Sequence, residues 1–227
     1  MNRSSLLHEF QSYECENPSC GLRFANDLSV AHFEHCPRCG SRMIKTGEPY
    51  TNFQRPAVKN ILDEHKLQLI LDNLRSAQNV GSIFRTANGA GVSHVYCCGT
   101  TPTPDHQGVR KASLGAEEQT TWSYHPNCLE LARTLRKNNY YLCALESTVE
   151  SISLLTHPLE AISQQNIALI LGNEVSGIDP QVLKLVDSSV HIPMAGVKTS
   201  LNVAVAAGIG LYWLIDRLNR LNSSKER

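Results

Sequence analysis

The segment Ile192–Tyr212 reads IPMAGVKTSLNVAVAAGIGLY. It begins at the end of a short apolar strand, passes through a loop of Gly, Lys and Thr, and enters a helix rich in Ala and Gly. Ser200 stands where the N-cap of that helix is expected, because its side-chain oxygen can accept hydrogen bonds from free backbone N–H groups. Glycine inside a helix costs about 1 kcal/mol relative to alanine. The small side chains therefore indicate close approach by another backbone, either in a tightly packed core or around a ligand or threaded chain.

The composition is that of a globular chain that can form one substantial α/β core and a small accessory module. The 227 residues are 41% hydrophobic and carry a formal net charge of +0, so only a local basic patch would favour a nucleic-acid partner. The N-terminus lacks the apolar segment of a signal peptide. The longest apolar run, Val203–Ile215, is shorter than the roughly 18 residues that cross a bilayer. We therefore expect a cytoplasmic protein with no membrane partner.

Half of the eight cysteines lie near the N-terminus and predict a zinc site. Four thiolates in two tight turns suit tetrahedral zinc, and metal binding would supply the folding free energy that so short a segment lacks. The spacing resembles a zinc ribbon, whose role here stays open between RNA contact and a structural appendage. The alternative is a set of reduced structural cysteines. The expected zinc ligands are Cys15, Cys20, Cys36 and Cys39.

The division of the chain follows from its composition. Gly47, Pro49 and Pro56 interrupt any regular pattern, so we expect 46–57 to be a linker. It would join the zinc-ribbon-like module, 1–45, to a large domain, 58–227. In that domain apolar strands alternate with amphipathic helices, which is typical of a parallel α/β sheet. The expected strands cover 66–71, 93–98, 140–145, 167–171 and 189–192.

Polar loops follow three of these strands, after Leu71, Leu171 and Ile192. In parallel sheets ligands bind beyond the carboxyl ends of the strands, so we expect the functional site there. The absence of GxGxxG and GxxxxGK[ST] motifs disfavours a Rossmann dinucleotide site or a P-loop. Another segment expected to be a loop, 99–115, carries the adjacent Arg110 and Lys111. These two residues either grip a phosphate backbone or lie in a solvated turn.

The three loops together resemble the three motifs of the SpoU (TrmH-like) branch of the SPOUT RNA methyltransferases. The likeness extends from about Lys66 to Leu218. Three motifs in the family's order are far more specific than any one of them. The first motif is NVGSIFRTA at 79–87, the second is LGNEVSGI at 171–178, and the third is IPM at 192–194 together with SLNVAVAA at 200–207. The likeness also includes KASLGA at 111–116 in the basic segment.

The resemblance implies an α/β knot, in which the C-terminal segment threads a loop of a mostly parallel sheet and forms a deep trefoil. It also implies a homodimer that uses S-adenosylmethionine as methyl donor. The implied reaction is methylation of a ribose 2′-hydroxyl in tRNA or rRNA. Carried residue by residue, the donor contacts of the family fall on Gly172, Ile192 and Leu201, with further contacts expected at Glu146, Asn173 and Met194.

Catalytic roles also follow from the resemblance. The family associates deprotonation of the ribose with the arginine at position 85, but free arginine has a pKa above about 12. We therefore expect Arg85 to fix the target phosphate and hydroxyl. Asn79 and Asn202 are assigned to orienting the substrate and the arginine, and Glu174 to shaping the site by hydrogen bonds. Ser200 matches the remaining polar motif position. The alternative is a non-catalytic RNA-binding or assembly protein, and the motifs do not identify the RNA.

Overall fold

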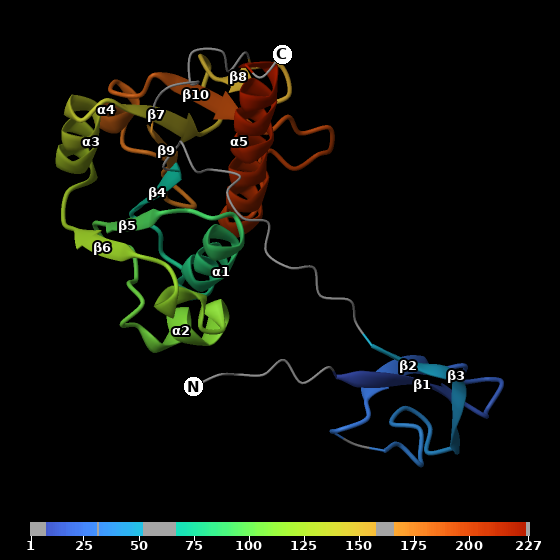
Figure 1. The fold of residues 1–227 in the computed structure, drawn as a ribbon. Coiled ribbons are helices and arrows are strands. Elements are labelled where there is room, and N and C mark those ends of the chain that lie inside the picture. Colours follow the sequence, from blue (N-terminus) through green and yellow to red (C-terminus); the bar gives the residue numbers. More distant parts are fainter. Residues whose placement is uncertain (1–7, 31, 52–66, 158–165, 226–227) are drawn as a thin grey trace. The chain divides into compact units, whose positions relative to one another are not determined.

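The computed structural model describes residues 8–30, 32–51, 67–157 and 166–225. The chain forms two compact units, Met1–Val58 and Lys59–Arg227, each of which has its own interior. Figure 1 traces the elements of both units along the sequence. Within the described ranges, no helix combines the length and the apolar character that a membrane span requires.

The N-terminal unit is a three-stranded antiparallel sheet with β1 in the middle. Its interior is small. The ring of Tyr13, which is 2% exposed, lies against the rings of Phe24 and Phe33, and Met43 closes the same cluster. The strands are β1 (Glu9–Cys15), β2 (Arg23–Asp27) and β3 (Met43–Thr51).

Strand β3 runs to Thr51, into the stretch that the sequence pattern assigns to a linker. Gly47 adopts a φ of 69°, and the pairing register of β1 shifts opposite it, between Phe10 and Ser12. A bulge at this point lets the strand continue past the glycine. Pro49 lies in the same shifted stretch of an edge strand, where a residue without an N–H is tolerated.

The C-terminal unit is built on a seven-stranded sheet in the order β6-β5-β4-β9-β7-β10-β8. Every pair of neighbouring strands in it is parallel. Five strands match the expected ones within one or two residues, while β6 and β8 were not expected. The strands are β4 (Leu67–Asp72), β5 (His94–Cys98), β6 (Trp122–His125), β7 (Tyr140–Leu145), β8 (Ile152–Ser153), β9 (Asn166–Leu171) and β10 (Ser188–His191).

Helices cover both faces of this sheet, and Figure 1 shows α3 and α5 on opposite sides of it. Successive residues of β4 point to opposite faces of the sheet, each of which has its own apolar cluster. Leu69 packs with α1 and α5, whereas Ile70 packs with α3 and α4. Both side chains are fully buried. The helices are α1 (Ala77–Gly89), α2 (Gln107–Ser113), the short 3₁₀ turn η1 (Ala116–Glu118), α3 (Cys128–Lys137), α4 (Pro180–Leu183) and α5 (Val203–Lys225).

The start of α5 corrects the expected N-cap. The helix begins at Val203, and the side-chain oxygen of Asn202, not of Ser200, accepts the backbone N–H of Ala204 at 2.8 Å. The small residues of α5 serve close packing, because a Cβ added to Gly210 would lie 2.9 Å from Leu145 Cδ2 on β7. The expected loop 99–115 is likewise corrected, since its basic pair lies on α2.

Candidate active site

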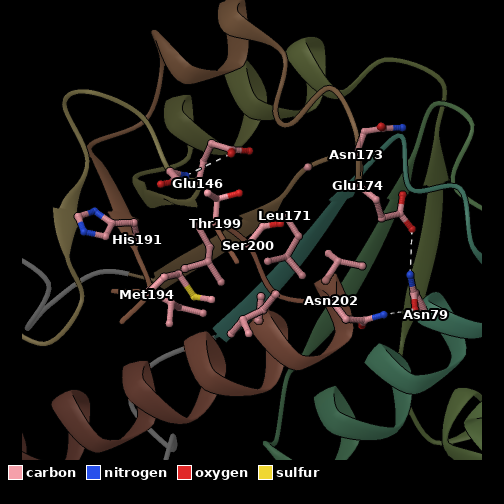
Figure 2. Close-up of a pocket in the computed structure, with 17 residues that line it drawn as sticks. Asn79, Glu146, Leu171, Asn173, Glu174, His191, Met194, Thr199, Ser200 and Asn202 are labelled. Carbon is pink, nitrogen blue, oxygen red and sulfur yellow. Dashed lines mark hydrogen bonds between the residues drawn. The ribbon is translucent and has the colours of Figure 1, made fainter. Parts of the chain in front are cut away.

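The loops that follow β4, β9, β7 and β10 meet at one edge of the sheet, because these four neighbouring strands are parallel. A cavity of 480 Å³ lies among them, and the first turn of α5 forms one side (Figure 2). All but one of the residues predicted to catalyse or to bind the donor line this cavity. They are Asn79, Glu146, Gly172, Asn173, Glu174, Ile192, Met194, Ser200, Leu201 and Asn202.

A chain of side-chain hydrogen bonds joins the three sequence motifs at this edge. Asn79 Nδ2 donates to Glu174 Oε1 at 3.0 Å, and Asn202 Nδ2 donates to Asn79 Oδ1 at 3.0 Å (Figure 2). The carboxamide of Asn79 therefore uses its nitrogen on one partner and its oxygen on the other. This arrangement fixes the orientation of the amide plane between loops that lie far apart in the sequence.

The carboxylate of Glu174 also holds the entrance to α1. It accepts the backbone N–H of Arg75 at 3.0 Å and that of Ser76 at 3.3 Å. Partial burial acts to raise the pKa of Glu174, but the donated hydrogen bonds, led by that of Arg75 and including that of Asn79, outweigh it. The pKa of Glu174 consequently lies below its ordinary value, and the group is ionised near neutral pH.

The second-motif loop is folded tightly onto itself. Asn173 Oδ1 accepts the backbone N–H groups of Val175 and Ser176 at 2.9 and 3.1 Å, and Asn173 Nδ2 donates to the carbonyl of Asn73 at 2.6 Å. A Cβ added to Gly172 would lie 2.4 Å from backbone atoms of Gly177 and the next residue. Only glycine fits at position 172, which explains its place in the motif.

Glu146, which was expected to contact the methyl donor, also supports this loop. Its Oε2 accepts the backbone N–H of Ile178 at 3.1 Å, and its Oε1 accepts that of Ser147 at 3.2 Å. A side chain at Gly177 would lie within 2.8 Å of the same carboxylate. The sequence motifs do not reveal this support, because Glu146 follows a different strand, β7.

Asp72 is a further supporting residue that the sequence reasoning missed. It is 1% exposed, and it accepts the backbone N–H of Asp179 at 3.3 Å and Asn73 Nδ2 at 2.8 Å. Burial raises the pKa of Asp72, and the donors, including the thiol of Cys128, offset only part of this effect. The position of Asp72 in the sequence could have predicted this role, because a carboxylate directly after a buried strand needs hydrogen-bond partners nearby.

His191 also lines the cavity without having been predicted. It is the last residue of β10, and its Nδ1 lies 2.9 Å from Ser151 Oγ. This contact ties the end of β10 to the loop after β7.

Comparison with known proteins assigns the C-terminal unit to a family. The model of the SpoU rRNA Methylase family matches residues 66–212, which hold all three motifs. The chain belongs to the SpoU rRNA methylase family. The predicted recognition is thereby confirmed, and so is the predicted fold class, an α/β-knot domain with a small cysteine-bearing N-terminal sheet.

Individual relatives support the assignment. The SpoU domain is 34% identical over 146 residues to the 23S rRNA (guanosine-2′-O-)-methyltransferase RlmB of Xylella fastidiosa, covering 64% of this chain and 57% of that protein. RlmB of Pectobacterium atrosepticum is 31% identical over 172 residues, which cover 74% of this chain and 67% of that protein. The solved structure of the SpoU methyltransferase AviRb of Streptomyces viridochromogenes matches with a TM-score of 0.60 and 26% identity. The match covers 68% of this chain and 60% of that one. The chain spans about three fifths of the length of the first of these curated relatives.

Arg85 is the predicted catalytic residue that does not line the cavity of the SpoU domain. It lies on α1 between buried neighbours, Phe84 and Ala87, and is itself exposed. Arg110 and Lys111 are exposed on α2, and Arg110 Nη1 donates to the carbonyls of Pro104 and Asp105 at 3.1 and 2.8 Å. The cavity and these cations are thus separate features.

The four N-terminal cysteines are brought together as predicted. Their sulfur atoms all lie within 4.8 Å of one another, with 3.5 Å between Cys15 and Cys39 and 3.7 Å between Cys20 and Cys36. Four thiolates about 2.3 Å from a tetrahedral zinc ion would lie about 3.8 Å apart. The geometry of the donor set therefore suits zinc. It is the only such cluster of potential metal ligands within the described ranges.

Proposed function

We propose that this protein transfers a methyl group from S-adenosylmethionine to a ribose 2′-hydroxyl of RNA. The observation that carries the proposal is the hydrogen-bonded chain Glu174–Asn79–Asn202 at the edge of a cavity formed by all three SpoU motifs. The names of the RlmB relatives describe this chemistry for those proteins. RNA, either rRNA or tRNA, is accordingly the proposed substrate. We place the reaction in the cytoplasm, where such RNA matures in bacteria.

The cavity suits the proposed donor. Its 480 Å³ falls within the roughly 300–1,000 Å³ of small-molecule sites. Backbone groups of Gly172, Ile192 and Leu201 would hold the donor, together with the side chains of Asn173 and Met194. S-adenosylmethionine supplies an electrophilic methyl group on a cationic sulfur. AviRb, which the domain resembles, has also been solved in complex with AdoMet.

The residues of the chain then orient the ribose. Asn79 presents a fixed amide because both of its ends are bonded, and the ionised Glu174 holds that amide and the start of α1 in place. We assign Arg85 to the phosphate beside the target ribose, so that the hydroxyl is aligned and its proton can pass to the phosphate or to solvent. Holding the hydroxyl and the methyl group in line is expected to account for most of the rate acceleration of this methyl transfer.

Methyl transfer tests this proposal directly. Tritiated S-adenosylmethionine is incubated with the protein and total RNA from cells that lack it, and the RNA is then hydrolysed with alkali. We expect label in alkali-resistant dinucleotides, because only a blocked 2′-hydroxyl protects the linkage. Label in mononucleotides would indicate a base methyltransferase of related fold. Donor binding without any incorporation would support the alternative of a non-catalytic RNA-binding or assembly protein.

We propose zinc as the ligand of the N-terminal cysteines. The expected module, 1–45, is extended by the rest of β3 to Thr51, and we propose 58–227 as the transferase domain. The sulfur geometry supports the first assignment. The test is metal analysis of the purified protein. One zinc ion per chain is expected, with none in a variant that replaces Cys15 and Cys39 by serine.

A homodimer is the proposed assembly of the SpoU domain. Helix α5 exposes Val205, Ile209 and Tyr212, which are 53%, 38% and 54% exposed. Their spacing of four and three residues places them in one apolar stripe along the helix. Sedimentation equilibrium should show a dimer that Ile209→Lys converts to a monomer. A monomeric wild-type protein would refute this assembly.

A further inference from the structure

Leu114, at the end of α2, has a backbone conformation that leucine rarely adopts. Its φ and ψ are 54° and 37°, in the left-handed region that helix ends usually fill with glycine. The side chain is 70% exposed, so burial does not compensate for the backbone strain. The leucine therefore adds backbone strain to the fold without gaining burial in return. Strained residues of this kind gather at functional sites, which makes the position a candidate for a function outside folding.

Two contacts place the segment 112–120 against α1, and Figure 1 shows α1 and α2 side by side. The two helices cross where a Cβ on Gly81 would lie 2.6 Å from Ala112 Cβ. Further along α1, Asn88 Nδ2 donates to Thr120 Oγ1 at 3.4 Å. Positions 81, 85 and 88 lie within about 60° of one another around a helix. Arg85 is therefore on the side of α1 that faces the segment 113–120, which carries Leu114.

Exposed charges of both signs lie near Leu114 in the sequence and on the facing side of α1. Arg85, Arg110 and Lys111 are exposed, and none of them forms an ion pair within the described ranges. The nearest acidic residues in sequence are the exposed Glu118 and Glu117, which is 8% exposed and accepts the hydroxyl proton of Ser113. This surface, defined by Leu114 and the three cations, joins one exposed apolar side chain to exposed charges that sum to +1, since three are positive and two, Asp105 and Glu118, are negative.

We propose that Leu114 contacts the RNA at a nucleotide next to the one that is methylated. The proposal rests on the function proposed above and adds a residue to it. A polyanion suits Arg85, Arg110 and Lys111, which form no ion pair in the part of the chain that the structure describes and can bind the phosphates of the strand. An apolar side chain such as leucine can then lie against the face of a base or between two bases, where it unstacks them.

The test uses Leu114→Gly and Leu114→Asn in the full-length chain. Both residues tolerate the left-handed conformation, and both remove the apolar contact. We expect a Tm no lower than that of the wild type, unchanged affinity for S-adenosylmethionine, and a roughly tenfold loss in kcat/KM for RNA and in RNA affinity. The RNA is total RNA from cells lacking the protein, and binding is measured by gel shift. Asn139→Gly, at another left-handed position (φ 60°), is the control for altered backbone strain alone.

Each outcome decides the proposal. Wild-type kcat/KM and RNA affinity in both Leu114 variants would overturn it while leaving the methyltransferase function intact. A clear fall in Tm would overturn it by assigning Leu114 to folding, and a shift from dimer to monomer would assign it to contact between two copies of the chain. If the wild-type protein binds no RNA, both this proposal and the proposed function fail.

Discussion

The N-terminal unit and the SpoU domain differ in what fills their interiors. The interior of the N-terminal unit consists of Tyr13, a few partly buried rings, Met43 and the cysteine cluster. The SpoU domain buries apolar residues on both faces of a seven-stranded sheet. At its centre β4 is buried at every residue, and β9 and β7 are buried at all but their end residues.

This difference determines where each unit is sensitive to change. A small antiparallel sheet with one thin layer beneath it has little apolar burial to offset its loss of chain entropy, and the proposed zinc ion would supply the remainder. A sheet covered on both faces is stable without ligands, and can hold strained or polar loops at its edge. The candidate active-site cavity lies at such an edge, and the following predictions test the comparison from the largest expected effect to the smallest.

Removal of one zinc ligand should have the largest effect. Cys36→Ser opens the proposed zinc site, and structural zinc contributes about 10 kcal/mol or more to the folding of small modules. We expect amides of β1–β3 to lose protection from hydrogen exchange, while those of β4 and β9 keep it. Mass spectrometry of exchange in each segment measures this directly. Cys97→Ser, at a fully buried cysteine of the SpoU domain, is the control; it should retain zinc and weaken the other unit instead.

A methyl group at Gly172 should destabilise the SpoU domain at the cavity. The added Cβ would lie 2.4 Å from backbone atoms of the same loop, which cannot move aside as a side chain can. We expect Gly172→Ala to cost about 2 kcal/mol or more in urea unfolding and to abolish donor binding in calorimetry. Gly196→Ala is the matched control, since nothing lies within 4 Å of its added Cβ. Equal stability of the two variants would contradict the tight loop.

Sequence patterns predicted the repeated and local features of this molecule well. Strands such as Tyr140–Leu145 are apolar runs bounded by polar residues, and parallel pairing then places their carboxyl ends together. The motif residues that line the cavity, Asn79 and Asn202 among them, follow from the family resemblance. The cysteine cluster follows from ligand spacing alone. In each case the information lies in a short segment or in a pattern that repeats.

The missed features depend on contacts between distant segments. Asp72 and Glu146 support the second-motif loop from other strands, so no local pattern reveals their partners. The capping role of Asn202 was given to Ser200 because both residues favour helix starts and the pattern alone does not choose between them. Helix α2 was missed because its segment is rich in residues that favour turns. The short β6 and β8 carry too few residues for a period to appear.

Asn79→Ala should have a smaller effect on stability than on activity. It breaks two hydrogen bonds of a partly exposed side chain, for which we expect about 1 kcal/mol of destabilisation. The loss of oriented groups should lower kcat by about a hundredfold at saturating donor. The neighbouring Gln78→Ala, at an exposed position of the same helix turn, should change neither quantity. A loss of stability without loss of transfer would assign Asn79 to folding alone.

The smallest predicted effect is a pair of opposite pH dependences in the SpoU domain. The pKa of Glu174 is lowered in the folded state, so its contribution to stability is present above its unfolded pKa of about 4.3 and is lost as pH falls through the folded value. The pKa of Asp72 is raised, chiefly by burial, so its contribution is greatest below its unfolded pKa of about 3.9 and falls as pH rises through the folded value.

Urea unfolding of Glu174→Gln and Asp72→Asn between pH 3 and 7 separates the two carboxylates. The stability difference between wild type and Glu174→Gln should grow with rising pH, because only the wild type gains the ionised hydrogen-bond acceptor. The difference between wild type and Asp72→Asn should change in the opposite direction, because only the wild type must bury a charge. Differences are compared because every other titrating group cancels in them, including those of the N-terminal unit. If the two stability differences changed with pH in the same direction, the two carboxylates would share one environment. That result would contradict the structure, in which Asp72 is buried and Glu174 is exposed.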